Sequence, residues 1–394
     1  MKYSLCLFRK STPAIFSVTL LSSLLSLPAH GQDNQQRLNQ MEERLNALQK
    51  QVTESNLEKT RFNGFFSTGY TRATNDAGYD EATEDSDLQT LSLFGLQGTF
   101  SLGRNTDAVL QLVSRGNENW DTELEWGYLR HQFHTGTEVR AGKMRLPLFM
   151  ESETLEIGYG QVWARPPEAV YDPVPVRSYL GADLAHTFNF DSSSLETRAF
   201  AGHLDDDADS LGQTIGVELR NLTGLTANWT NYLWTFRGVY ARADASIGSV
   251  GGPVNLGQNE KAEFMGLGLS YDDGAWLLMS ELTRVEVDGL FQNTDSAYIT
   301  FGRRIKEVTP YITASWIESK DNFKRDGTPL AVLDTRRQAY SLGMRWDLVA
   351  SVAMKFDWTH ARGFGNTTGG LIGNQLGGSF NSTDVYTVRL DAAF

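Results

Sequence analysis

The feature that most constrains this chain is a run of strand-like segments whose connections alternate in length. From Arg61 onward, sixteen segments with alternating apolar and polar residues are separated by turn-rich breaks. The longer breaks include 75–87, 145–179, 245–260, 321–335 and 362–382, and the shorter ones include 103–104, 191–194, 272–274 and residue 307. Odd-numbered connections are therefore mostly long and even-numbered ones short, so the two ends of the predicted sheet differ.

Several predicted strands have one apolar face. Trp234, Phe236 and Tyr240 share one parity, while Thr235 and Arg237 fall on the other, as expected of a strand with unlike surroundings on its two sides. The predicted strands span 62–73, 88–101, 105–116, 122–135, 137–144, 180–190, 195–203, 211–221, 230–244, 261–271, 275–286, 294–306, 308–320, 336–347, 350–361 and 383–394. The segments 277–279 and 91–96 do not alternate well, and we interpret them as faces toward a neighbouring subunit.

The last strand carries an uninterrupted apolar face that ends on an aromatic residue. The residues on that face are Tyr386, Val388, Leu390, Ala392 and Phe394. This strand resembles the closing strand of Gram-negative outer-membrane β-barrels. The resemblance implies that the barrel insertion machinery reads this strand and that it pairs with the first strand.

These features together predict an all-β fold, a sixteen-stranded antiparallel transmembrane β-barrel over residues 61–394. Outer-membrane barrels have long external loops and short periplasmic turns, whereas a soluble sandwich has no reason to segregate loop length in this way. A barrel of about sixteen strands leaves an aqueous channel, so the strand count points to a pore.

The first 60 residues have a different character. Lys2, Arg9 and Lys10 precede an apolar stretch, which predicts a signal peptide over residues 1–31. Residues 32–60 predict a short periplasmic α-helical coiled coil, and a polar linker is the alternative. The predicted trimer seam follows 3, 4 spacing and consists of Leu38, Met41, Leu45, Leu48 and Val52.

Composition excludes several classes of protein. The only cysteine, Cys6, lies in the predicted signal, so the mature chain has no thiol chemistry and no disulfide. Removal of the signal leaves 32 of the 35 basic residues against 48 acidic ones, a net charge of −16, which makes nucleic acid an improbable partner. No window of about 18 apolar residues predicts a membrane-spanning helix in the mature chain.

The signal, the sixteen-strand rhythm, the long third external loop and the aromatic last strand resemble the trimeric Gram-negative porins. The resemblance implies a homotrimer in the outer membrane, passive diffusion of small hydrophilic solutes, and a third loop, residues 145–179, that folds inward and narrows the lumen. The coiled coil departs from the commonest general porins and is similar to some substrate-preferring ones.

The third loop and the predicted inner wall carry opposite charges. The acids of the loop are Glu151, Glu153, Glu156, Glu168 and Asp172. The bases predicted to face inward near mid-strand are Arg140, Arg237, Lys355 and Arg389. If the two sets oppose each other, a transverse field would favour polar solutes; the alternative is that the loop acids are merely solvated.

Other chemistry has little support in the sequence. His131 and His134 have opposite strand parity, and no cluster of residues predicts a metal site or a cofactor. The acidic run 205–209 predicts either a solvated loop or a divalent cation site that bridges lipopolysaccharide. No compact catalytic group is visible, so we predict a channel and not an enzyme. The alternatives are a phosphate- or carboxylate-preferring channel, and a barrel hydrolase or envelope tether.

Overall fold

The computed structural model describes residues 60–394, apart from residues 175, 211–212 and 251–253. The predicted signal peptide and the coiled-coil seam from Leu38 to Val52 lie outside the described residues. The described helices include none that is long and apolar enough to span a membrane.

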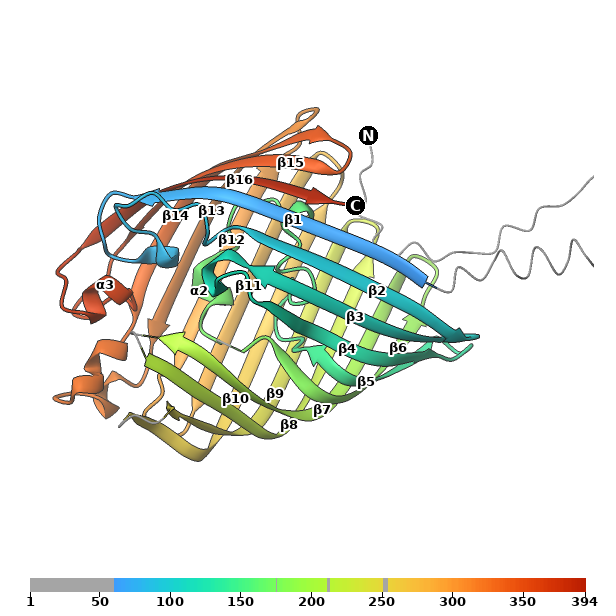
Figure 1. Ribbon diagram of the computed structural model, residues 1–394, viewed down its shortest axis with the longest axis horizontal. Helices are drawn as coiled ribbons and strands as arrows, with labels where there is room; N and C mark the ends of the chain where they lie inside the picture. Colours follow the sequence, from blue (N-terminus) through green and yellow to red (C-terminus); the bar gives the residue numbers. More distant parts are fainter. Residues whose placement is uncertain (1–59, 175, 211–212, 251–253) are drawn as a thin grey trace, which may run out of the picture. The chain divides into compact units, whose positions relative to one another are not determined.

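The described chain forms one closed antiparallel barrel (Figure 1). Its strands are β1 (Thr60–Ala73), β2 (Leu93–Gly103), β3 (Thr106–Arg115), β4 (Thr122–Gln132), β5 (Thr137–Arg145), β6 (Ser178–Asn189), β7 (Ser193–Ser210), β8 (Gln213–Asn231), β9 (Trp234–Ser249), β10 (Asn255–Asp272), β11 (Trp276–Val287), β12 (Thr294–Arg303), β13 (Val308–Ser319), β14 (Arg336–Val349), β15 (Val352–Arg362) and β16 (Ser382–Ala393). The helices of α type are α2 (Glu168–Tyr171) and α3 (Ile372–Gln375), and the short 3-10 turns are η1 (Tyr79–Glu81), η2 (Gly116–Glu118), η3 (Gly158–Gly160), η4 (Asn322–Lys324) and η5 (Pro329–Leu333).

The first and last strands close the ring. They pair antiparallel from Phe65 opposite Ala393 to Ala73 opposite Val385. At the end of this seam the Gly64 N–H donates to the Phe394 carbonyl at 2.7 Å, and the Phe394 N–H donates back to Gly64 at 2.9 Å. A β-carbon on Gly64 would lie 2.4 Å from the Phe394 ring, so glycine lets the terminal aromatic side chain lie over the first strand.

The strands alternate between an apolar outer face and a more polar inner face. On β16 Tyr386 is 52% exposed, whereas Thr387 and Arg389 on the other parity are 3% and 5% exposed. Large apolar side chains such as Leu267 on β10 and Ile312 on β13 are likewise exposed on the outside. This arrangement of apolar outside and polar inside suits a wall that separates lipid from water.

The predicted sixteen-stranded antiparallel barrel is confirmed, and three predicted breaks are wrong. Residues 205–209 belong to β7, 222–229 belong to β8, and most of 245–260 belongs to β9 and β10. In β7, Leu204 is buried on the inner face, while Asp205 and Asp207 are exposed. Asp206 between them is exposed as well, so these three aspartates show no alternation in exposure, which is why their composition suggested a loop. The predicted acidic loop is therefore part of a strand.

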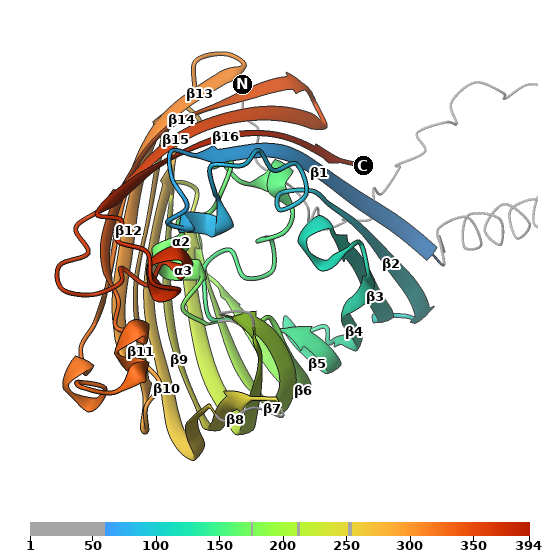
Figure 2. The same ribbon diagram turned by 60° about the vertical axis from the view of Figure 1, so that its left-hand side comes forward.

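The connection between β5 and β6, residues 146–177, is called here the inner loop. Figure 2 shows this green segment, with α2, inside the ring of strands. Its apolar residues, among them Leu148, Phe149 and Val170, pack against the inner faces of β7 to β13 and form the main hydrophobic cluster of the barrel. Leu277 and Met279 of β11 belong to this cluster and point inward, so the interpretation of 277–279 as a subunit contact is wrong for these two side chains.

Candidate functional site: the inner loop and the lumen wall

The inner loop reaches strands far from those that carry it. The Trp163 indole N–H donates to Thr300 Oγ1 on β12 at 2.8 Å. The backbone N–H of Ala164 donates to Asp357 Oδ2 on β15 at 3.1 Å. Arg345 of β14 donates to the Tyr159 and Gln161 carbonyls at 2.6 and 2.7 Å. Because β12 to β15 lie across the ring from β5 and β6 in strand order, the loop crosses the lumen.

Buried charges on the wall hold the loop at its deepest turn. Lys355 Nζ on β15 donates to the Gly158 carbonyl at 2.6 Å and pairs with Asp391 Oδ2 at 3.0 Å. Arg389 on β16 donates to the Ala164 carbonyl at 3.1 Å and pairs with Asp391 at 2.8 Å. The side chains of Lys355 and Asp391 are both 0% exposed. These predicted wall bases therefore contact the loop backbone directly.

The backbone of Gly158 lies against this ion cluster. A β-carbon at this position would lie 2.0 Å from Asp391 Oδ1 and 2.8 Å from Arg389 Nη2. A glycine is required here for close approach, because any side chain would displace the loop from the wall.

Two further predicted bases contact the opposite part of the loop. Arg140 of β5 pairs with Glu153 at 3.1 Å and with Asp183 of β6 at 2.8 Å. Arg237 of β9 donates to the Pro147 carbonyl at 2.5 Å and to Asn228 Oδ1 at 2.9 Å. All four predicted wall bases therefore touch the inner loop, either at a carboxylate or at a carbonyl.

The predicted loop acids have unlike surroundings. Thr154 Oγ1 donates to Glu151 at 2.5 Å, and burial raises the pKa of Glu151. Burial would also raise the pKa of Glu153, but attraction from Arg140 and Arg198 outweighs it and the pKa falls below its ordinary value. Glu153 therefore remains ionised, and its side chain is 48% exposed.

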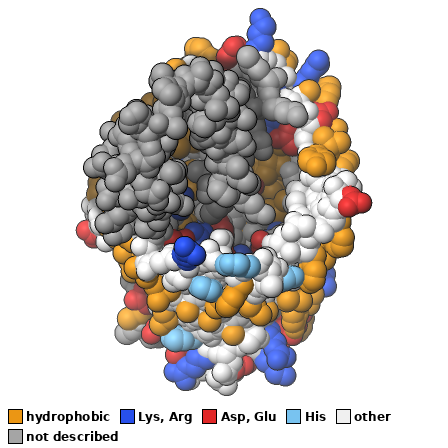
Figure 3. Space-filling view, turned by 90° about the vertical axis from the view of Figure 1, so that its right-hand side faces the viewer, with side chains coloured by type: hydrophobic (Ala, Val, Ile, Leu, Met, Phe, Trp, Pro, Cys, Tyr) orange, Lys and Arg blue, Asp and Glu red, His pale blue; other side chains and the backbone are white. Residues whose placement is uncertain are grey.

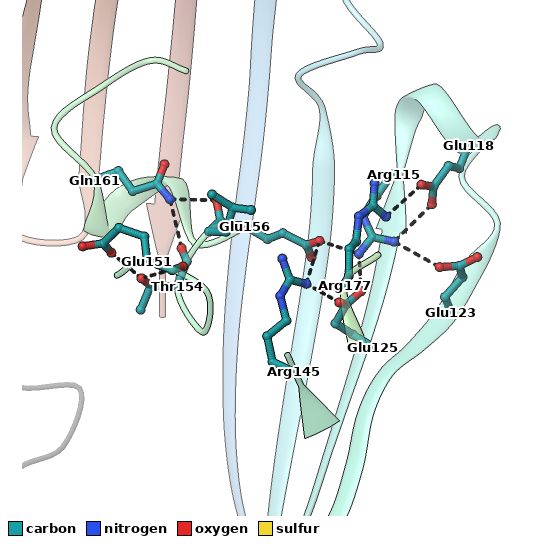
Figure 4. A network of polar contacts seen from close by, with 11 residues as sticks. Arg115, Glu118, Glu123, Glu125, Arg145, Glu151, Thr154, Glu156, Gln161 and Arg177 are labelled. Atoms are coloured by element: carbon teal, nitrogen blue, oxygen red, sulfur yellow. Dashed lines mark hydrogen bonds and ion pairs between the residues drawn. The ribbon is translucent and has the colours of Figure 1, made fainter. Parts of the chain in front are cut away.

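Glu156 lies in an ionic network at the start of the loop (Figure 4). Its carboxylate pairs with Arg115 at 2.5 Å and with Arg145 at 3.4 Å. Both guanidinium groups also contact Glu125, and Arg177 pairs with Glu118 at 3.0 Å. Attraction from Arg145 and Arg115 overcomes the opposing effect of burial and lowers the pKa of Glu156. The network joins the ends of β3 and β5 to both arms of the inner loop.

A second carboxyl cluster lies around α2. Glu168 pairs with Arg337 of β14 at 3.0 Å, yet burial raises its pKa to about 8. Burial raises the pKa of Asp172 to about 6. Arg165 donates to the Asp80 carbonyl in the connection between β1 and β2. The connection between β1 and β2 and the inner loop therefore meet at this cluster.

Several charged residues of the wall were missed by sequence reasoning. They are Arg115, Glu125, Arg145, Asp183, Arg198, Glu281, Arg337 and Arg345. A usable signal was present, because each charge falls on or beside a predicted membrane strand, where a charge is expected to face inward. What the sequence lacked was the path of the loop, which decides which of these charges meet.

The histidines that the structure describes are spread over the wall and are not clustered around a metal site. His131 and His186 lie on β4 and β6. The Nδ1 atom of His131 is hydrogen-bonded to the hydroxyl of Thr106, and that of His186 to the hydroxyl of Thr137, each at 2.8 Å. Figure 3 shows histidine side chains along the rim at the end of the barrel opposite α3. Among the described residues, no group of three or more His, Cys, Asp or Glu is placed to hold a metal ion.

Comparison with solved structures gives extensive matches at low sequence identity. An anion-selective porin from Comamonas acidovorans matches over 85% of this chain and 99% of its own, with 17% identity and a TM-score of 0.57. The chain has the porin fold. Salmonella typhi OmpF, in a complex with daunomycin, matches over 85% and 97% of the two chains, with 11% identity and a TM-score of 0.59.

The outer-membrane channel DcaP of Acinetobacter baumannii matches this porin fold over 85% and 97% of the two chains, with 9% identity and a TM-score of 0.54. No protein-family model and no curated protein matches the sequence. The likeness therefore rests on the arrangement of strands, and the contacts of the lumen have to be interpreted from this chain's own residues.

Proposed function

We propose that the protein is an outer-membrane porin that forms a water-filled channel for passive diffusion of small hydrophilic solutes and ions. In this proposal residues 1–31 are a cleaved signal peptide, residues 32–60 form a periplasmic coiled coil, and the barrel spans the outer membrane of a Gram-negative bacterium. The protein acts as a homotrimer, contacts lipopolysaccharide and is inserted by the barrel insertion machinery. It has no enzymatic activity.

The observation that carries the proposal is the closed sixteen-stranded barrel with an inner loop bound across its lumen. A barrel of this size is wide enough to leave an aqueous channel. Contacts with Arg140, Arg237, Lys355 and Arg389 hold the loop at several points around the wall. A loop held in this way would define a constriction of constant width and set the largest solute that passes.

The charges of the constriction set the preference for ions. In our proposal Glu153 and the partly exposed Arg177 act on passing ions, while the buried pairs of Lys355 and Arg389 mainly fix the loop. The field at the constriction then depends most on the exposed charged groups. The two opposite charges of a buried ion pair lie close together, so their fields largely cancel at the position of a passing ion.

The test is a planar bilayer recording of the refolded mature protein. We expect ohmic steps that close in groups of three. Glu153→Gln should shift the zero-current potential in a salt gradient toward anion preference, whereas Glu307→Gln, in the short turn before β13, should leave it unchanged. Protein that is folded but never conducts would overturn the channel and favour a barrel hydrolase or an envelope tether.

A second candidate is a channel of the same fold that prefers phosphate or carboxylates. Three buried guanidinium nitrogens favour it: Nε and Nη2 of Arg165 and Nε of Arg237 have no hydrogen-bond partner among the described residues. An anion could take up these donors. Saturable block of the current by phosphate or succinate would support this candidate, and a current that stays linear with both would exclude it.

A further inference from the structure

The strands at the long-loop end of the barrel reverse their pattern of polarity. On β9, the outward Phe236 and Tyr240 are exposed, as expected beside lipid. Farther along, the outward positions are Arg242 and Asp244, while the inward positions 241, 243, 245 and 247 carry Ala, Ala, Ala and Ile, all buried. A strand with a charged outer face and an apolar inner face belongs in water and not in lipid. This part of β9 therefore stands beyond the apolar band.

Neighbouring strands continue the same apolar inner surface. Together with the alanines of β9, it consists of Val217, Leu219 and Leu222 of β8, Ala262 and Phe264 of β10, and Val285 and Val287 of β11. The inner wall of a porin-like channel is ordinarily polar. An apolar inner wall at the mouth of a channel is unfavourable in contact with water, so we expect other apolar groups to cover it.

The inner loop supplies part of this apolar cover. Both arms of the inner loop lie against the apolar wall. The first arm contributes Leu146 and Leu148, and the second contributes Pro173, Val174 and Val176. They leave a cavity of about 80 Å³, which Phe291 lines from the connection between β11 and β12. A single water needs roughly 10–15 Å³ of such space, so the cavity has room for a group several times larger.

The cavity exists because its wall carries small side chains. Ala241, Ala243 and Ala245 alternate along β9, and larger residues at these positions would fill the space. If the surface served only to seat the inner loop, close packing would leave no such space. The recess is partly open to solvent, and Arg242 and Glu263 also border it, but the rest of its lining is apolar. A recess with such a lining takes up apolar groups because their burial removes apolar surface from water.

We propose that this recess binds the straight aliphatic chain of small amphipathic solutes at the external mouth of the channel, while the polar head remains in the water of the lumen. The proposal rests on the proposed channel function, because it places the recess on the path of entering solutes. Burial of each methylene strengthens binding roughly fourfold until the recess is full.

The test uses the trimer in a planar bilayer and the carboxylates acetate, butanoate, hexanoate and octanoate as blockers. We expect the affinity of the current block to rise roughly fourfold per methylene. Ala243→Leu, which fills the recess, should weaken the hexanoate block roughly tenfold or more and leave the acetate block and the open conductance unchanged. A block independent of chain length, or one that Ala243→Leu leaves intact, would overturn the proposal.

A second variant guards against misfolding of the first. Val285→Thr keeps the volume of the side chain but adds a hydroxyl to the recess, and should weaken the hexanoate block in the same direction. Val113→Thr makes the same chemical change at a buried position of β3 that does not line the recess, and should leave the block unchanged.

Direct binding separates this proposal from the channel itself. Hexanoate binding to the protein in lipid nanodiscs, followed by saturation-transfer NMR, requires no conductance. A preparation without conductance whose signal is reduced by Ala243→Leu would reject the channel and retain the recess. A conducting preparation in which Ala243→Leu has no effect on the signal would reject the recess and retain the channel.

Discussion

Replacement of Gly158 by alanine should loosen the inner loop from the wall. The added β-carbon would lie 2.0 Å from Asp391 Oδ1, whereas an ordinary contact begins at about 3.4 Å. The two groups must therefore separate by about 1.4 Å. Asp391 is held by Lys355 and Arg389, so the loop backbone is the part that moves.

The size of the effect follows from the hydrogen bond that this movement breaks. Lys355 Nζ donates to the Gly158 carbonyl at 2.6 Å, and a hydrogen bond from a charged donor contributes about 1.5–3 kcal/mol. A loss of about 2 kcal/mol would raise the population of loops detached at this point about thirtyfold. We expect broader step sizes and more open-channel noise in single-channel recordings.

The matched control is Gly238→Ala on β9. A β-carbon there meets nothing within 4 Å, so the same chemical change in a strand should leave both step size and noise at the level of the unmodified protein. If Gly158→Ala conducts with the same steps and noise as Gly238→Ala, the contact between the loop and the ion cluster does not control the constriction.

Three further predictions concern buried charge, pH and assembly. Lys355→Met leaves the buried Asp391 with only Arg389 as a cation and should destabilise the barrel by about 3–5 kcal/mol, seen as a lower unfolding temperature of the refolded protein in detergent; an unchanged temperature would contradict this. Burial raises the pKa of Glu168 from an ordinary 4.5 to about 8, so the folded chain binds more protons than the unfolded chain between these values, and the free energy of unfolding falls as pH rises through them. Glu168→Gln should flatten the dependence of unfolding temperature on pH between about 6 and 8. Asp172, with a pKa of about 6, contributes less to the pH dependence in this range. An equally steep dependence in the variant would refute the raised pKa of Glu168. Deletion of residues 33–58 should lower the temperature at which the trimer dissociates in detergent, and an unaffected trimer would remove the predicted coiled coil from assembly.

The strands could be predicted from the sequence because the two faces of the barrel wall have unlike surroundings, which imposes a period of two on them. Arg389 and Tyr386, on opposite parities of the last strand, illustrate this, since the first is buried in the lumen and the second is exposed outside. The pattern failed for 205–209 and 245–260, because most of the described outward-facing residues of these segments are polar and at least partly exposed. There the expected apolar outer face is absent, and strands resemble loops.

The site was only partly predictable. Parity alone places Arg140, Arg237, Lys355 and Arg389 on the inner wall, and the length of the third loop, together with the resemblance to porins, singled out residues 145–179. Parity cannot show that Lys355 meets the Gly158 carbonyl, because this contact spans 197 positions of the chain and depends on the path of the loop. The transverse field between opposed rows of charge stays a prediction, since Arg140 and Glu153 form a direct pair.

The seam between the first and last strands also determines the order in which this protein can assemble. Ser67 donates to Asp391 across 324 positions, and the final residue bonds to Gly64. No closed ring can exist until β16 has been made and pairs with β1, so every earlier intermediate has two unpaired strand edges that require protection. Such a distant pairing is slow to form unaided. Deletion of Phe394 would remove the two backbone hydrogen bonds at Gly64. We expect this deletion to slow insertion of the barrel more than it lowers the stability of the inserted barrel.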